Sequence, residues 1–437
     1  MGRTGHSQGA TTGRIVHKLT RPAAIKARKV AASPDNPEYR VERGKTAARA
    51  ARSTSELRKA RGSVRALGGR TMRMIALTAV AALLASCGDG QSAMADPGAS
   101  GRGPSANAEA DAQNPNQRIF RDWLVVCDNI GTCHAFGHAT EGTGWVRITM
   151  AAGPEATLRI AVGFWPENGT FGGPVTVRVD TTTFDGLTAA TGEDAPSLAT
   201  VGPGMARALV DEMAQGQTMT LNAGAETVPI SLSGAAASLL WIDEHQGRLD
   251  TTTALIRKGS RPASAVPAAA PVPRITPAPA VSQTGYGDQE GQTLPAAIEA
   301  LPAVVQCRAD TDFNPDLQKV ISSARLDANT ILWSVPCGAG AYNFSSAWFT
   351  ATPQGANPRR VTFPTASGEP QDQLVNAAYD PATRVIDAFN KGRGLGDCGM
   401  ADSWTWTGQG FVLKSSSEMS ECWGVPGDYW PTTWVSE

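Results

Sequence analysis

Hydrophobic residues beyond position 118 occur in short runs that alternate with polar residues or are rich in β-branched side chains. Turn-forming residues bound these runs, and that pattern predicts short β-strands. In the first part of this region the predicted strands lie at residues 122–127, 144–151, 156–164, 174–181, 218–221 and 227–232.

Helical spacing interrupts these strands twice. Residues 204–214 place four apolar side chains on one face, with Gly216 as a stop, and Ser233 can cap a second helix over residues 234–246. The order of elements contains no strand–helix–strand alternation of the kind that builds a parallel sheet. We therefore expect a β-rich domain with two helices.

The last part of the chain follows a similar pattern. Asn314 and Pro315 mark the start of a short helix, and strands and turns follow it. Residues 403–413 predict a hairpin folded at residues 408–410. The predicted fold class is therefore mainly β with a few helices, in two small antiparallel, sandwich or barrel-like domains.

Low-complexity segments separate these parts. Residues 88–117 contain almost no apolar residues beyond alanine and predict a flexible tether after Cys87, while residues 260–293 are rich in proline and alanine and predict an extended spacer. Domain one then covers residues 118–259 and domain two covers residues 294–437. We expect the two domains to fold independently.

An export signal precedes the tether. Arg73 is followed by about a dozen apolar residues, which are too few for a bilayer span of roughly 20 residues, and then by Leu-Ala-Ser-Cys ending at Cys87. This ending resembles the lipobox of bacterial lipoproteins. The resemblance implies that residues 72–86 are a signal peptide and that Cys87 is lipidated, so the membrane is a partner through the lipid anchor.

Charge is distributed unevenly along the chain. Residues 1–70 carry 17 Lys or Arg against 4 Asp or Glu, whereas residues 88–437 carry 21 against 36. We interpret residues 1–71 as a basic disordered extension that arises from a start codon assigned too early; a genuine cytosolic extension is the alternative. The acidic remainder argues against a nucleic-acid partner.

Six cysteines remain besides Cys87, and an even number in an exported chain predicts disulfides. Two lie in domain one and four in domain two, so pairing within each domain is expected. The predicted pairs are Cys127–Cys133, Cys307–Cys337 and Cys398–Cys422. A rival interpretation makes Cys127, Cys133, His134 and His138 zinc ligands, but their spacing fits no standard zinc motif, and no metal is expected.

Few residues suggest catalysis. Asp243, Glu244 and His245 are adjacent on a predicted helix and point in different directions, so we interpret them as a charged outer face. Residues 394–399 match the glycine fingerprint of dinucleotide-binding proteins, but a strand rather than a helix follows them, which indicates a glycine-rich turn and no cofactor.

Aromatic residues gather near the C-terminus. Trp404, Trp406 and Trp423 are expected to pack in a β-core beside Cys398 and Cys422. Tyr429 and Trp430 lie in a loop bounded by glycine and proline, which makes them the candidates for a ligand-facing aromatic surface.

Five sequence blocks look familiar in combination. They are Asp122-Trp123 with Cys127 and Cys133, residues 230–234, residues 246–248, residues 392–398 and residues 430–432. In this order they resemble domain-of-unknown-function family 1176 of bacterial exported proteins, from about residue 118 to the C-terminus. Domain one is also similar to the invasion-associated locus B family. Neither resemblance supplies catalytic residues.

These patterns favour an exported cell-envelope lipoprotein that faces the periplasm from the outer membrane, since Gly88 rather than aspartate follows the lipidated cysteine. We expect a non-enzymatic module that binds an envelope protein or a glycan. The alternatives are a lysozyme-inhibitor-like or invasion-related protein and a hydrolase of an envelope polymer.

Overall fold

The computed structural model describes residues 115–167, 169–192, 195–287 and 293–437. The expected basic extension, the signal peptide, Cys87 and most of the tether lie outside the described residues. No helix among the described residues is long and apolar enough to cross a membrane.

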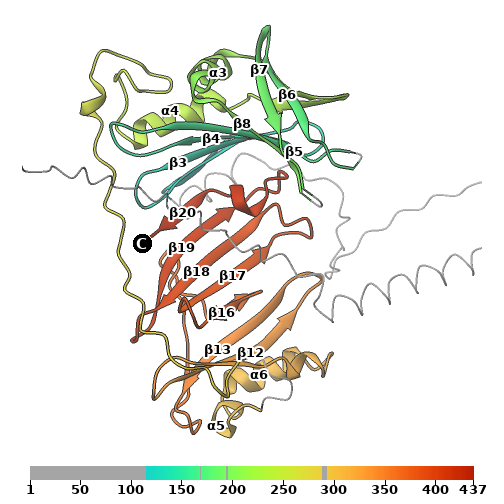
Figure 1. Ribbon diagram of the computed structural model, residues 1–437, viewed down its shortest axis with the longest axis vertical. Coiled ribbons are helices and arrows are strands. Elements are labelled where there is room, and N and C mark those ends of the chain that lie inside the picture. The colour runs from blue at the N-terminus through green and yellow to red at the C-terminus, as the bar shows by residue number, and fades with distance from the viewer. Residues whose placement is uncertain (1–114, 168, 193–194, 288–292) are drawn as a thin grey trace, which may run out of the picture. The chain divides into compact units, whose positions relative to one another are not determined.

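Domain one contains two antiparallel sheets (Figure 1). The strands are β1 (Gln117–Phe120), β2 (Trp123–Cys127), β3 (Cys133–His138), β4 (Gly144–Met150), β5 (Leu158–Phe164), β6 (Gly173–Val179), β7 (Thr182–Ala189), β8 (Ser197–Val201), β9 (Thr218–Ala223) and β10 (Glu226–Ser231). One sheet has the order β1-β2-β3-β4-β5-β8, and the other has the order β10-β9-β6-β7.

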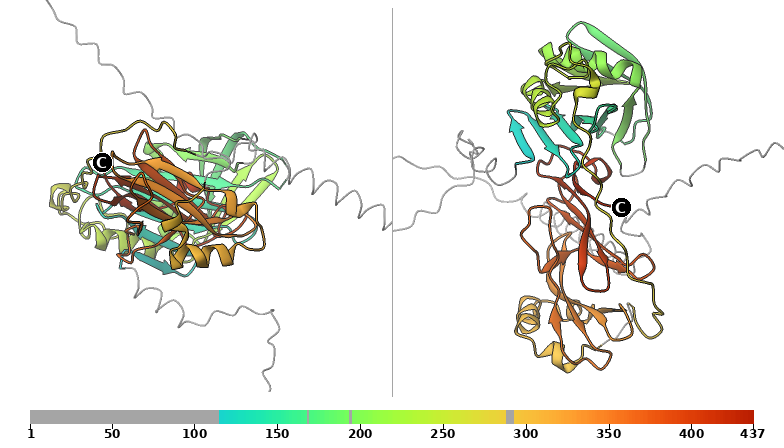
Figure 2. Two further views of the ribbon diagram at one scale, coloured as in Figure 1. Left: turned by 90° about the horizontal axis from the view of Figure 1, so that it is seen from below. Right: turned by 90° about the vertical axis from the view of Figure 1, so that its left-hand side faces the viewer.

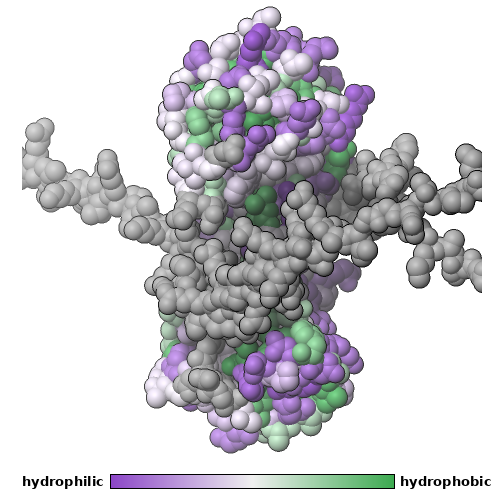
Figure 3. Space-filling view, turned by 90° about the vertical axis from the view of Figure 1, so that its right-hand side faces the viewer, coloured by the Kyte–Doolittle hydropathy of each residue, from purple (hydrophilic) through white to green (hydrophobic). Residues whose placement is uncertain are grey.

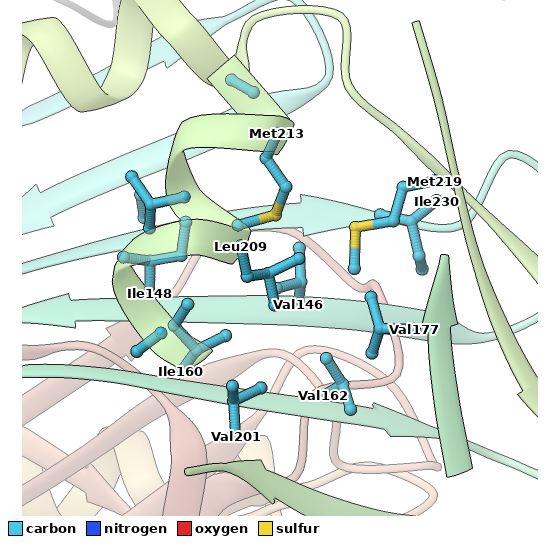
Figure 4. Close-up of a cluster of buried hydrophobic side chains, with 14 of the residues drawn as sticks. Val146, Ile148, Ile160, Val162, Val177, Val201, Leu209, Met213, Met219 and Ile230 are labelled. Atoms are coloured by element: carbon cyan, nitrogen blue, oxygen red, sulfur yellow. The ribbon is translucent and has the colours of Figure 1, made fainter. Parts of the chain in front are cut away.

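Two helices cover one face of the six-stranded sheet: α3 (Pro203–Gln215) and α4 (Ala235–His245) (Figures 1 and 2). They arise where the sequence predicts them. Leu209 and Met213 of α3 pack among aliphatic side chains of both sheets, including Val146 and Val177 (Figure 4). Burial of this apolar face holds α3 in place.

The start of α4 differs from the expected cap. Its N-cap is Gly234 rather than Ser233, and no side chain caps the helix. Gly234 has a φ of 107°, and a Cβ at this position would lie 1.8 Å from the carbonyl oxygen of Phe120. The close approach of β1 therefore selects glycine at this turn.

Strand β2 is buried on both faces, which explains its continuous apolar sequence. Trp123, Val125 and Cys127 belong to the core beneath the helices. Leu124 and Val126 point to the opposite face, where they join a second cluster that includes side chains from domain two.

Domain two is built from two antiparallel sheets, and no sheet among the described residues closes into a barrel. The strands are β11 (Ser322–Arg325), β12 (Ile331–Ala339), β13 (Phe344–Ala351), β14 (Arg359–Arg360), β15 (Gln373–Val375), β16 (Ala378–Asp380), β17 (Val385–Lys391), β18 (Gly399–Trp406), β19 (Phe411–Met419) and β20 (Thr432–Val435). The first sheet has the order β11-β12-β13-β14 with β15 beside β13, and the second has the order β16-β17-β18-β19-β20. The mainly β, antiparallel fold class is confirmed.

The core of domain two lies between these sheets and contains Trp348, Trp404 and Trp406. The hairpin expected over residues 403–413 forms from β18 and β19. A further cluster packs α5 (Ala296–Glu299) and α6 (Pro302–Asp310) against β12 and β13.

The helix expected at Asn314 is a different element. A short 3₁₀ helix, η2 (Leu317–Lys319), forms there. The Asn314 side chain accepts hydrogen bonds from the backbone N–H groups of Asp316 and Leu317. The α-helix lies earlier, where Pro302 occupies its first turn. Two further 3₁₀ helices are η1 (Ala263–Ala265) and η3 (Gly427–Tyr429).

The proline- and alanine-rich segment hydrogen bonds with domain two. The backbone N–H of Ile275 donates to the carbonyl of Glu437, and that of Ala278 donates to the carbonyl of Trp406. The described part of this segment thus adds backbone contacts beside the C-terminal sheet.

Candidate functional site

Three disulfides brace the described residues, and they join the pairs expected from the sequence. Cys127 and Cys133 are direct partners on β2 and β3. Cys307 of α6 is bonded to Cys337 of β12, and Cys398 is bonded to Cys422 in the segment after β19. The two domains are therefore disulfide-braced, as expected.

The glycine-rich turn over residues 392–399 is fixed by a buried carboxylate. Asp397 is 1% exposed and accepts a hydrogen bond from Arg393 Nε at 2.6 Å, a second from Arg393 and one from the backbone N–H of Gly424 at 2.7 Å. Burial by itself raises the pKa of Asp397, but these hydrogen bonds outweigh burial and lower the pKa below its ordinary value. The ionised carboxylate and the Cys398–Cys422 disulfide tie the turn to the segment after β19.

This turn is not a dinucleotide site, because β18 and not a helix follows it. The turn presents Leu395, which is 45% exposed, at the surface. Tyr342, which lies between β12 and β13 and is 42% exposed, adjoins the turn, because a Cβ on Gly394 would lie 3.6 Å from its ring. Two exposed apolar side chains therefore lie on adjoining segments.

The aromatic residues near the C-terminus differ from the expectation. Trp430 is 2% exposed, stacks on Phe389 at 5.1 Å and donates from its indole N–H to the carbonyl of Val425, so it does not face a ligand. Tyr429 is half-buried against Trp145. Trp423 lies outside the domain core and stacks on His138 at 4.4 Å. Contacts with domain one cover these rings, and no local sequence pattern indicates such contacts.

The two histidines that the zinc interpretation invoked have other partners. His134 is 3% exposed, and its ring nitrogens lie 3.1 Å from Thr149 Oγ1 and 3.0 Å from Thr432 Oγ1. Burial and the nearby Arg147 guanidinium lower the pKa of His134 to about 3, so its ring is neutral at pH 7. Desolvation also lowers the pKa of Arg147 to about 10. These groups join β3 and β4 to β20.

A different histidine lies beside the Cys127–Cys133 disulfide. His245 ends α4, and one of its ring nitrogens and both Sγ atoms all lie within 4.8 Å of one another. The ring of His245 stacks on Trp241 at 4.9 Å, and burial lowers the pKa of His245 below its ordinary value. A cavity of about 330 Å³ opens beside His245 and is also lined by Asp128, Gly131 and Gln246.

Asp243 is not part of a charged outer face. It is 0% exposed and accepts the backbone N–H groups of Leu255 at 2.6 Å, Ile256 at 2.8 Å and Arg257 at 3.2 Å. The carboxylate thereby folds residues 255–257 back onto the end of α4. Backbone N–H groups can replace water around a buried carboxylate, which explains the burial of a residue type that is ordinarily exposed.

Two carboxyl groups lie between the sheets of domain two. Asp402 on β18 is 8% exposed and has one oxygen without a hydrogen-bond partner. Glu418 on β19 is its diagonal neighbour, since Asp402 pairs with Ser416. Burial raises the pKa of both groups, and the charge of Asp402 raises the pKa of Glu418 further.

The comparisons with known proteins give a family without a described activity. The family described as protein of unknown function (DUF1176) matches residues 117–437. The chain belongs to this family. It is also 30% identical over 346 residues to the uncharacterized protein YpfG of Escherichia coli strain K12. The aligned region covers 74% of this chain and 93% of that protein. The DUF1176 resemblance carried by the sequence blocks is thus confirmed.

Two further matches are partial. Among solved structures, the crystal structure of invasion associated protein b from Bartonella henselae matches with a TM-score of 0.24 and 13% identity, covering 30% of this chain and 98% of that chain. The family of hypervirulence associated proteins TUDOR domain matches residues 3–57, which lie outside the described residues.

Two groups of side chains could not be found from the sequence. His245 lies 112 residues beyond Cys133, and no spacing rule connects them. Asp402 and Glu418 are 16 residues apart and meet because β18 and β19 pair with a bulge near Trp404. The alternation of β18 places Asp402 on the same face as Trp404, and this was the one available signal for its burial.

Proposed function

We propose that this DUF1176 protein is an exported, lipid-anchored protein of the cell envelope, facing the periplasm from the outer membrane. The observation that carries this proposal is the set of three disulfides in the described domains. Disulfides persist in oxidising compartments. The Leu-Ala-Ser-Cys segment ending at Cys87 would provide the cleavage site of the signal peptide and the lipidated cysteine.

We further propose that the protein is a non-enzymatic module that binds a protein partner through the glycine-rich turn. The Arg393–Asp397 pair, the Gly424 hydrogen bond and the Cys398–Cys422 disulfide hold the turn in one conformation. A rigid turn loses little conformational freedom on binding, so the exposed side chains of Leu395 on the turn and of Tyr342 on the adjoining segment are available for affinity.

The turn differs from other places where apolar side chains are exposed. The space-filling view shows small apolar areas scattered among polar ones on the face it presents (Figure 3). Isolated apolar residues are ordinary at a protein surface. Leu395 and Tyr342 differ because they lie on adjoining segments that are fixed in place.

The test compares a turn variant with a matched surface variant. Leu395→Ser removes the apolar tip, while Val412→Ser changes a side chain that is 41% exposed on β19. Each protein is used as the full chain and is cross-linked in envelope preparations. We expect the wild type and Val412→Ser to retain the same protein partner. Leu395→Ser should weaken its retention by about tenfold or more.

Two outcomes would contradict this proposal. Equal retention by Leu395→Ser and the wild type would exclude the turn as the contact. Sedimentation with purified peptidoglycan, together with no protein cross-link, would favour a glycan ligand instead.

A second candidate function, hydrolysis of an envelope polymer, is favoured by the Asp402–Glu418 pair. Acid–base catalysis uses carboxyl groups whose pKa values are raised. It ranks second because Asp402 is 8% exposed and lies between two packed sheets. Loss of a hydrolytic activity in both Asp402→Asn and Glu418→Gln, with the fold retained by circular dichroism, would favour the enzyme.

A further inference from the structure

The disulfide of domain one lies beside donors that a soft metal ion prefers. Cys127 and Cys133 face each other on neighbouring strands, and α4 crosses β1, β2 and β3 to bring His245 over them. One ring nitrogen of His245 and both Sγ atoms are within 4.8 Å of one another. Three donor atoms from three elements therefore converge at one point.

A fourth soft side chain occupies the next position across the sheet. Met150 on β4 is the direct ladder partner of Cys133 on β3. Directly opposed residues place their side chains on the same face, and Met150 is buried in the same core cluster as both cysteines. The row Cys127, Cys133, Met150 thus presents sulfur atoms on the face that α4 covers.

Hydrogen bonds hold the end of α4 close to the two cysteines. The Gln246 amide donates to the carbonyl of Gly131 at 2.7 Å and to the carbonyl of Met150 at 2.9 Å. Arg248 is 0% exposed and donates to Gln246 Oε1 at 2.6 Å and to the carbonyl of Gly153 at 2.7 Å. Buried hydrogen bonds therefore fix the residues that follow His245 to the strands that carry the sulfur atoms.

A cavity lies beside this cluster. The cavity of about 330 Å³ that His245 lines is also bounded by Gly131, which lies in the turn between the two cysteines, and by Asp128. His245 is exposed toward solvent, whereas Cys127 and Cys133 are 1% and 0% exposed. Of the three donor residues, His245 is the one that lines this cavity.

We propose that the reduced form of this cluster binds Cu⁺ through Cys127, Cys133 and His245, and that the disulfide closes the site. Two thiolates and an imidazole with the Met150 thioether beside them suit the soft Cu⁺ ion, whereas a structural Zn²⁺ site takes four protein ligands. The site and the disulfide use the same sulfur atoms, so only one of them exists at a time.

The chemistry balances with a dithiol as the reductant. A dithiol donates two electrons and two protons, the bond between the two Sγ atoms breaks, and the dithiol becomes a disulfide. Cu⁺ then displaces the two thiol protons as the sulfur atoms bind it as thiolates. A disulfide-containing oxidant reverses the step: it accepts two electrons from the two thiolates, takes up two protons from solvent to become a dithiol, and the Cys127–Cys133 bond reforms as Cu⁺ is released.

The test uses the full chain carrying Cys87→Ser, so that the Cys87 thiol does not bind the ion. The protein is reduced with dithiothreitol, freed of it without oxygen, and titrated with Cu⁺ in competition with a chromophoric Cu⁺ chelator. His245→Gln removes the imidazole ligand, and His138→Gln is the matched control, since His138 stacks on Trp423 away from the cysteines. Circular dichroism checks that each variant is folded.

We expect the reduced protein to bind Cu⁺ and the oxidised protein to bind none at the same chelator concentration. His245→Gln should lower the affinity by about tenfold or more, and His138→Gln should leave it unchanged. A variant with both Cys127→Ser and Cys133→Ser keeps the other four cysteines, which measure binding by unrelated thiols, and should lose the Cu⁺ binding that depends on His245.

Three results would overturn the proposal. They are equal Cu⁺ affinity in His245→Gln and the reduced parent protein, unchanged binding in the double serine variant, and tighter retention of Zn²⁺ than of Cu⁺ by the reduced parent protein.

Discussion

At the residue scale, buried carboxylates hold segments that the hydrophobic pattern leaves undefined. Asp243 is the strongest case, because it satisfies three backbone N–H groups in residues 255–257. We expect Asp243→Ala to lower the free energy of unfolding by about 3 kcal/mol, since buried donors lose their acceptor. Glu244→Ala is the matched control, because Glu244 is exposed on the same turn. Equal unfolding midpoints in urea for the two variants would contradict this role of Asp243.

Asp402 gives a prediction for pH at the same scale. Burial raises the pKa of Asp402 in the folded protein, so its contribution to stability is full below the ordinary carboxyl pKa and is lost as the pH rises through the raised value. Asp402→Asn cannot lose that proton. The melting temperature of the wild type should therefore fall relative to that of Asp402→Asn between pH 4 and pH 8. A difference that does not change with pH, measured by calorimetry, would show that Asp402 does not titrate in this range.

At the scale of elements, some glycines are required by the backbone conformation and others are not. Gly234→Ala should destabilise the protein by about 3 kcal/mol, because φ is 107° and the new Cβ would meet the carbonyl oxygen of Phe120. Gly204→Ala, in the first turn of α3 with open space around it, should stabilise the protein by about 0.5 kcal/mol. Thermal melting of the two variants measures both effects, and shifts of the same sign would contradict the assignment.

The sequence predicts elements well where a local pattern determines them. Alternation, helical spacing and turn residues place β4, α3 and the β18–β19 hairpin close to where they form. The burial of Trp430 and His134 could not be predicted, because it depends on contacts between segments about 300 residues apart, such as that of His134 with Thr432. The same limit applies to His245, whose position beside the disulfide depends on how α4 crosses the sheet.

At the scale of the whole molecule, one core cluster is shared between the two predicted domains. Leu124, Phe136 and Trp145 of domain one belong to it together with Val425 and Trp430 of domain two. A hydrogen bond of 2.8 Å from the Trp165 indole to the carbonyl of Gly424 lies in the same region. These contacts favour mutual stabilisation over the independent folding expected from the linker.

A truncation tests this coupling. Residues 294–437 alone would expose Met419, Val425 and Trp430, and each such side chain contributes about 1.5–3 kcal/mol when buried. We expect this fragment to melt at least about 10 °C below residues 118–437 when both are produced under oxidising conditions. Equal melting temperatures of the two fragments would show that domain two folds independently of domain one.

We propose that the protein is exported and held to a membrane by lipid on Cys87. Mass spectrometry of the N-terminal peptide from membrane-fractionated protein is the test. We expect a mature chain that begins at Cys87 and carries a diacylglyceryl group on the thiol and an acyl group on the new amino terminus. A mature chain that retains residues before Cys87, or that begins at Cys87 without added lipid mass, would contradict it.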